Sequence, residues 1–102
     1  MDDFLVIAIT PPDHYPHEAQ IINRLLGDNM VNFVHIRKPS FSSEEIEDLI
    51  ARIEPRFHPR LKLHDHFDLL DKYDLVGVHL NSRNKDSHPN AKSVSISLHS
   101  LE

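Results

Sequence analysis

VNFVHIRKPSFSSEEIEDLIARI, residues 31–53, contains a predicted strand and a predicted helix with a proline between them. Residues 31–38 are typical of a β-strand, and Pro39 ends it because proline cannot donate a hydrogen bond to a sheet. Ser42 and Glu45 have the spacing of a capping box, which predicts that a helix begins there. The apolar residues that follow share one face of this helix: Ile46, Leu49, Ile50 and Ile53. A strand followed directly by a helix is the repeating unit of a parallel α/β sheet.

Segments of the same two kinds alternate on both sides of this stretch. The predicted strands are 4–10, 60–65, 75–80 and 93–99, and the predicted helices run from residue 17 to Gly27 or Asn29 and over 67–73. The connection 81–92 is polar and contains a proline, which predicts a loop. Repeated strand–helix units imply parallel strands joined by right-handed crossovers, as in an α/β sheet or an α/β barrel.

The length of the chain limits which of these architectures it can complete. Its 102 residues fit one domain, since domains average about 150 residues. A closed barrel of eight strand–helix units needs at least about 200 residues. The five predicted strands therefore form either a small open sheet or part of a barrel.

Composition excludes several classes of function. The chain has no cysteine, so it can hold neither a disulfide nor a thiolate zinc site. Its formal net charge of −5 gives no broad attraction to nucleic acid or to anionic lipid. The longest apolar run, residues 4–9, is far shorter than the roughly 20 residues that span a bilayer, and the acidic start differs from a signal peptide. We therefore expect a cytoplasmic protein with no nucleic-acid or membrane partner.

Each predicted strand is apolar through its body and turns polar near its carboxyl end. The carboxyl ends of parallel strands open on one face of a sheet or barrel, and ligands bind there. Histidine exchanges protons near neutral pH and arginine binds phosphate, so this mixture suits proton transfer on an anionic substrate. Half-buried structural histidines are the alternative interpretation. The residues concerned are His35, Arg37, His64, Asp65, His79, Ser97 and His99.

Two further interpretations concern residues beside these strand ends. His64 and His66 would project the same way from a strand, which suits zinc, unless His66 already lies in the following helix. Lys38, Arg83 and Lys85 are candidates for phosphate contacts, and solvation of basic loop residues explains them equally well.

Five motifs resemble, in order, those of the thiamine phosphate synthase (thiamine phosphate pyrophosphorylase) and TenI family. They are ITPP at 9–12, VHIRK at 34–38, LHDHFDL at 63–69, GVHL at 77–80 and SLHSLE at 97–102. The resemblance implies a parallel (β/α)8 TIM barrel. Residues 1–102 would be a partial barrel domain that supplies about the first five strands.

The resemblance also assigns roles to individual positions. In thiamine phosphate synthases two aspartates hold magnesium, which neutralises the pyrophosphate leaving group. Arg37 and Asp65 match the family pattern, and Asp65 would be a magnesium ligand. This sequence departs from the family pattern at four positions. It has His35 in place of glutamine, Pro39 in place of lysine, His64 in place of asparagine and Asn84 in place of the second aspartate. The amide of Asn84 carries no charge, which weakens a magnesium site.

A TenI-like thiazole tautomerase is therefore the first functional hypothesis. Such an enzyme needs no cofactor and moves a proton within a carboxythiazole phosphate to make the ring aromatic. His99 matches the TenI histidine that transfers this proton, while Arg37 and His64 would shape the carboxylate end of the pocket. The remaining substrate-binding candidates are His35, Lys38, His79 and Ser97.

Two alternatives stay open. The first is a thiamine phosphate synthase that joins hydroxymethylpyrimidine pyrophosphate to thiazole phosphate, with Mg²⁺ held by Asp65, Asp86 or substrate oxygens. The second is a non-catalytic degenerate barrel, or a half-barrel that pairs with another copy. A homodimer is the expected assembly.

Overall fold

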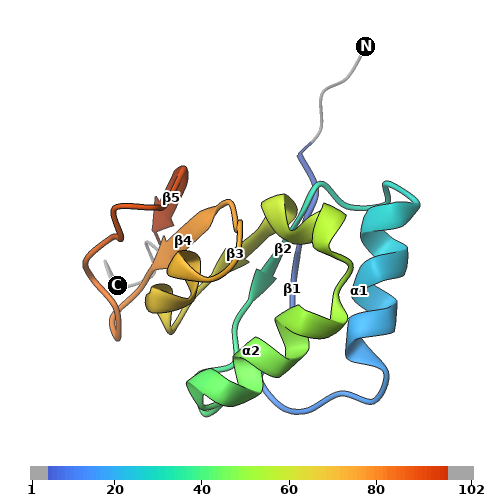
Figure 1. The fold of residues 1–102 in the computed structure, drawn as a ribbon, viewed down its shortest axis with the longest axis horizontal. Helices are drawn as coiled ribbons and strands as arrows, with labels where there is room; N and C mark the ends of the chain where they lie inside the picture. The colour runs from blue at the N-terminus through green and yellow to red at the C-terminus, as the bar shows by residue number, and fades with distance from the viewer. Residues whose placement is uncertain (1–4, 97–102) are drawn as a thin grey trace, which may run out of the picture.

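Five parallel strands form one sheet in the chain order β1-β2-β3-β4-β5, as Figure 1 shows. The computed structural model describes residues 5–96. The strands are β1 Ile7–Ile9, β2 Phe33–Ile36, β3 Leu61–Leu63, β4 Gly77–Leu80 and β5 Ser93–Ile96. The helices are α1 Glu18–Gly27 and α2 Ser43–Arg52, with short 3-10 helices η1 Pro55–Arg60 and η2 Phe67–Asp71. The predicted parallel α/β architecture is confirmed.

The local structure follows the sequence signals closely around α2. The Ser42 side chain accepts a hydrogen bond from the Glu45 backbone at 3.1 Å, and the Glu45 carboxylate accepts one from the Ser42 backbone at 2.8 Å. The predicted capping box is therefore present. Strands β2, β3 and β4 are shorter than predicted, and η1 was not predicted, although Pro55 at its first position suits a helix start.

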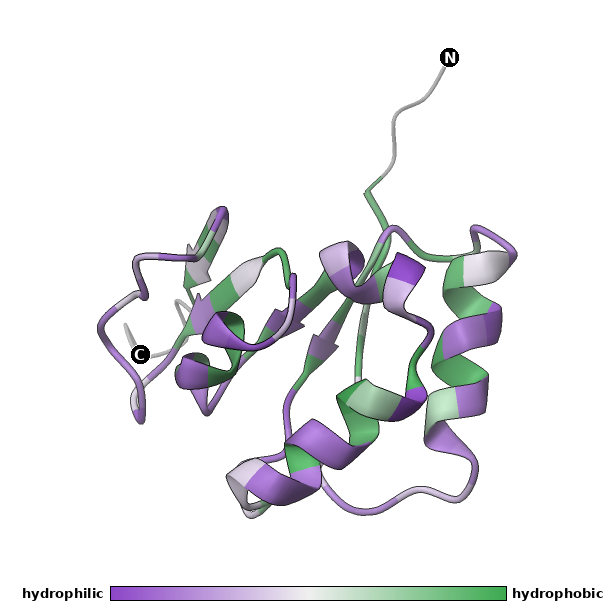
Figure 2. Cartoon of the chain, viewed as in Figure 1, coloured by the Kyte–Doolittle hydropathy of each residue, from purple (hydrophilic) through white to green (hydrophobic). Residues whose placement is uncertain are grey.

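A hydrophobic core lies between the helices and one face of the sheet. Val34, Ile36, Leu61, Leu63 and Val78 point from the central strands into this core. They pack with residues of the helices, including Ile22 and Leu26 of α1 and Ile46 and Ile50 of α2. Figure 2 shows apolar and polar residues alternating along both helices, as expected for helices with one buried face. Since side chains alternate along a strand, the residues between these core positions point to the opposite face of the sheet.

The two edge strands carry exposed apolar side chains. Ile7 and Ile9 of β1 are 42% and 58% exposed, and Val94 and Ile96 of β5 are 50% and 59% exposed. Within residues 5–96, β1 pairs only with β2 and β5 only with β4, so the sheet is open at both edges. No helix among these residues has the length and hydropathy needed to cross a membrane.

Candidate functional site

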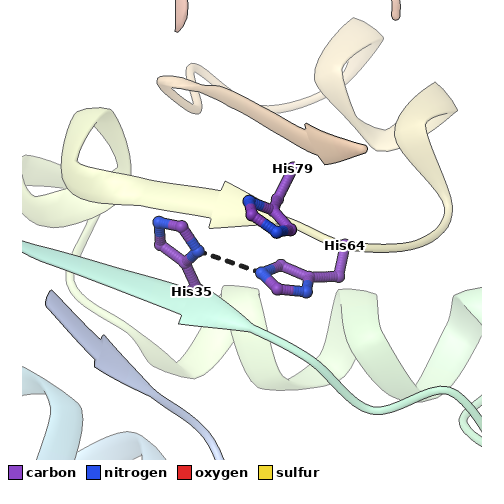
Figure 3. A group of neighbouring side chains, drawn as sticks. All are labelled: His35, His64 and His79. Atoms are coloured by element: carbon purple, nitrogen blue, oxygen red, sulfur yellow. Dashed lines mark hydrogen bonds between the residues drawn. The ribbon is translucent and has the colours of Figure 1, made fainter. Parts of the chain in front are cut away.

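Three histidines from neighbouring strands meet on the sheet face that is opposite the helices. Strand register aligns His35 with Lys62, and it aligns Leu63 with Val78, so that His64 and His79 are neighbours at the strand ends. His35 Nδ1 lies 2.9 Å from His64 Nε2 in a hydrogen bond, which Figure 3 shows. The His64 and His79 rings stack with centroids 4.3 Å apart. The predicted gathering of these three residues at one site is thus present in the structure.

A polar layer on β3, β4 and β5 supports these rings. His79 Nδ1 is hydrogen-bonded to Ser95 Oγ at 2.7 Å. Lys62 Nζ donates to Ser93 Oγ at 2.9 Å and to Ser95 Oγ at 3.2 Å. Sequence analysis did not identify Lys62 as a site residue. The sequence feature that could have identified Lys62 is its position two residues before His64, because this spacing places both side chains on one face of the strand.

Burial strongly favours the neutral form of two of the imidazoles. It lowers the pKa of His35 from 6.5 to about 4, and the charges of Lys62 and His79 add to the effect. Burial likewise lowers the pKa of His64 from 6.5 to about 3, with smaller contributions from neighbouring charges that include Arg37 and a partial opposition from Asp65. Both rings are therefore neutral near pH 7, where one donates and the other accepts their shared hydrogen bond.

We expect the free energy of unfolding to fall as the pH is lowered below about 6.5. The unfolded chain then gains protons that the folded chain takes up only near pH 4 at His35 and pH 3 at His64. Each group contributes a slope of up to about 1.4 kcal/mol per pH unit, and above pH 6.5 the contribution is constant. Urea unfolding at pH 7, 6 and 5 with a chelator present measures this slope. The His64→Gln variant should show a smaller slope than the parent protein, and the His14→Gln variant should show the same slope as the parent. Equal slopes in the parent and both variants would contradict the assignment.

A pocket of about 1150 Å³ opens over this histidine group. Arg37, Arg83 and Lys85 line it together with the three histidines, and no carboxylate of the described residues is among its lining side chains. The predicted phosphate candidates Arg83 and Lys85 therefore lie at the pocket. The basic part of the lining suits an anionic group on a ligand. The apolar part of the lining comes from Ile7, Ile9, Leu80 and Ile96.

Lys38 is not at this pocket, although Arg37 beside it is. The Lys38 side chain is 1% exposed and forms an ion pair with Glu18 at 2.9 Å. Its Nζ also donates to the backbone oxygens of Pro11 at 2.7 Å and Asp13 at 2.6 Å. This arrangement anchors the segment that follows β1, so the structure gives Lys38 a role in the fold and does not place it with the other predicted substrate-binding residues.

Asp65 lies beside the pocket, and cationic and amide groups hold its carboxylate. Arg83 donates to both carboxylate oxygens, at 3.0 and 3.3 Å, and the Asn84 amide donates to Oδ1 at 2.8 Å. Within residues 5–96, neither Asp65 nor Asp86 is part of any group of three potential metal ligands. A magnesium ion needs several oxygen ligands, and here an arginine occupies the carboxylate. The residues in this arrangement do not fit magnesium.

The remaining candidates do not join the histidine group. His66 Nε2 is hydrogen-bonded to the Phe41 backbone oxygen at 2.8 Å, at the start of η2, so His66 does not share a ligand position with His64. The zinc interpretation based on that pair is therefore not supported. Ser97 and His99 lie outside the described residues.

Similarity to a solved structure supports the family resemblance of this chain. No protein-family model matches the sequence, and no curated protein matches it. Among solved structures, the crystal structure of thiamine phosphate pyrophosphorylase from Bacteroides thetaiotaomicron is similar, with a TM-score of 0.84 and 33% sequence identity. The match covers 93% of this chain and 48% of that protein, so the chain spans about half of its length. Fold and sequence together confirm the resemblance of this chain to the thiamine phosphate synthase (thiamine phosphate pyrophosphorylase) family, over about half the length of that relative.

Proposed function

We propose that the protein is a thiamine-biosynthesis enzyme that transfers a proton within a thiazole phosphate, as TenI-like thiazole tautomerases do. The observation that carries the proposal is the pairing of Asp65 with Arg83 at 3.0 Å, where a synthase would hold magnesium. A proton transfer within one molecule releases no pyrophosphate and has no need of that ion. The similarity to a thiamine phosphate pyrophosphorylase supports the coarser assignment to thiamine biosynthesis.

The strand order supports a (β/α)8 barrel as the complete fold. All five strands are parallel and lie in sequence order, whereas doubly wound sheets reverse their order at a switch point. In such barrels the active site lies at the carboxyl ends of the strands, and phosphate commonly binds at the loops after strands seven and eight. The pocket described above would therefore receive the thiazole ring and its carboxylate.

In this scheme the pocket residues bind the substrate and His99 supplies the catalytic group. Arg37 would pair with the substrate carboxylate, and the neutral His64 and His35 would hydrogen-bond the ring substituents. His99 would remove a proton from one ring position and return it to another, so that no proton is gained or lost overall. His79 and Ser97 would complete the wall of the pocket.

Incubation of the full-length protein with the unrearranged carboxythiazole phosphate tests the proposal. We expect the aromatic isomer to appear, monitored by NMR, and a His99→Ala variant to slow its formation by about 100-fold or more. His14 is exposed and does not line this pocket, so His14→Ala should leave the rate unchanged. Absence of product, or an unchanged rate in the His99 variant, would reject the tautomerase.

A thiamine phosphate synthase is the second candidate, favoured by the described activity of the similar solved structure. In that case binding of the substrates would have to release Asp65 from Arg83 so that a metal ion could reach the carboxylate. Magnesium-dependent release of pyrophosphate, with both substrates present, would decide for the synthase. If neither reaction occurs, a non-catalytic binding protein is favoured.

A homodimer stays a separate proposal, because the open edges at β1 and β5 are covered either by the remaining strands of the barrel or by a second copy of the chain. Ile9 and Ile96, at opposite edges of the sheet, are 58% and 59% exposed. Edge strands of this kind require cover from another segment or another chain. Sedimentation velocity of the full-length protein measures the assembly, and a monomer would contradict this proposal.

A further inference from the structure

We propose that His35, His64 and His79 form a binding site for a zinc-class divalent transition-metal ion, whose open coordination position takes an anionic oxygen in the pocket. This site is distinct from the magnesium position of the family, and the proposal does not depend on the tautomerase activity. Imidazole suits zinc, copper and nickel, whereas magnesium prefers oxygen ligands.

The distances between the ring nitrogens are close to those of a metal site. One nitrogen from each of the three histidines lies within 4.8 Å of the other two. Zinc binds imidazole at about 2.0–2.1 Å, so two nitrogens of a tetrahedral site lie about 3.3 Å apart. The His35–His64 pair, now 2.9 Å apart, would open slightly, and the longest separation would close by at most about 1.5 Å. Binding would also require the His64 and His79 rings to rotate out of their present stack, in which the ring planes differ by 19°, because the lone pairs of imidazole lie in the plane of the ring.

The sheet holds the three ligands in place. They lie on β2, on β4 and at the end of β3, which is the strand between those two, and their rings meet on one face of the sheet (Figure 3). His35 and His64 are buried, which lowers solvent competition for the ion. The bond between Ser95 Oγ and His79 Nδ1 orients the His79 ring, as second-shell bonds orient the ligands of known metal sites.

The surrounding charges determine what else the ion would bind. Three imidazoles leave one position of a tetrahedral zinc ion open, as in catalytic zinc sites. Lys62 and Arg37 are positively charged neighbours that disfavour a bare cation, and Asp65 offsets them only in part because Arg83 pairs with it. An anionic oxygen at the open position removes this disadvantage, and Arg37 in the same pocket wall can bind the same anion.

Titration of the untagged, chelator-treated full-length chain with Zn²⁺, with inorganic phosphate present, tests the site without any thiazole substrate. We expect one tightly bound Zn²⁺ per chain, no displacement by millimolar Mg²⁺, and visible absorption bands of a four- or five-coordinate ion when Co²⁺ replaces Zn²⁺. Absence of stoichiometric Zn²⁺ binding, or displacement by Mg²⁺, would overturn the proposal. Because the readout is binding, its failure is distinguishable from a failure of the tautomerase assay.

Single substitutions locate the ion. His35→Ala, His64→Gln and His79→Gln should each weaken Zn²⁺ binding by at least about 100-fold, since even the loss of a second-shell partner costs 10- to 100-fold. His14→Ala, which changes an exposed histidine outside the pocket, should bind like the parent protein. Circular dichroism verifies that each variant is folded, and one folded variant suffices for the test. Parent-like affinity in the folded variants would show that the ion binds elsewhere and would overturn the assignment.

Discussion

Replacement of Gly77 by alanine should separate β5 from β4. A Cβ atom at Gly77 would lie 1.8 Å from the Ser93 backbone oxygen and 2.7 Å from its carbonyl carbon. These atoms belong to the paired strand, so no side-chain rotation relieves the contact. We expect a loss of at least about 3 kcal/mol in the free energy of unfolding, at the upper end of the range for overpacking. The hydrogen bonds of Lys62 and His79 to the serine side chains of β5 should be lost as well.

The matched control is the other glycine of the chain. A Cβ atom at Gly27 would meet the Phe57 ring at 3.4 Å, which is an ordinary contact. Gly27 ends α1, and alanine is favoured over glycine in helices by about 1 kcal/mol, so Gly27→Ala should be neutral or slightly stabilising. Urea unfolding of both variants provides the comparison. A Gly77→Ala protein as stable as the parent would show that β4 and β5 do not pair as described.

Replacement of Lys38 by methionine should destabilise the protein by about 3–5 kcal/mol. The side chain of Glu18, only 9% exposed, would then be buried without its cation, and its Oε2 atom already has no hydrogen-bond partner in the structure. Three hydrogen-bonded oxygens, on Glu18, Pro11 and Asp13, lose their donor at once. The segment between β1 and α1 should therefore become exposed to limited proteolysis.

Two further variants distinguish the effect of leaving a charge buried and unpaired from the effect of removing a lysine side chain. The ion pair of Lys92 with Asp74 has a similar distance, 2.8 Å, but both side chains are 66% exposed. Lys92→Met should therefore cost less than about 1 kcal/mol. The double variant Glu18→Met/Lys38→Met should be more stable than Lys38→Met alone, because it leaves no unpaired buried charge. Equal effects of Lys38→Met and Lys92→Met would contradict the buried ion pair.

Local sequence patterns were enough to predict the five strands and both α-helices in their order along the chain, but not η1. The capping box of Ser42 and Glu45 is a contact between residues three positions apart, and the helix that it starts follows from the spacing of the apolar residues. The gathering of His35, His64 and His79 also followed from the sequence, because the carboxyl ends of parallel strands share one edge. Both inferences depend only on short-range periodicity and on the handedness of the strand connections.

Interactions between segments far apart in the sequence required the tertiary structure. Arg37 and Lys38 are adjacent basic residues that were both predicted to bind an anionic substrate. Because side chains alternate along the chain, Arg37 lines the pocket and Lys38 pairs with Glu18. The pairing of Asp65 with Arg83 joins two loops and places an arginine at the carboxylate that was expected to bind magnesium. The sequence thus determined which side chains reach the carboxyl edge of the sheet. Only the register and packing of separate segments decided which of those side chains are neutralised by a partner and which face the pocket.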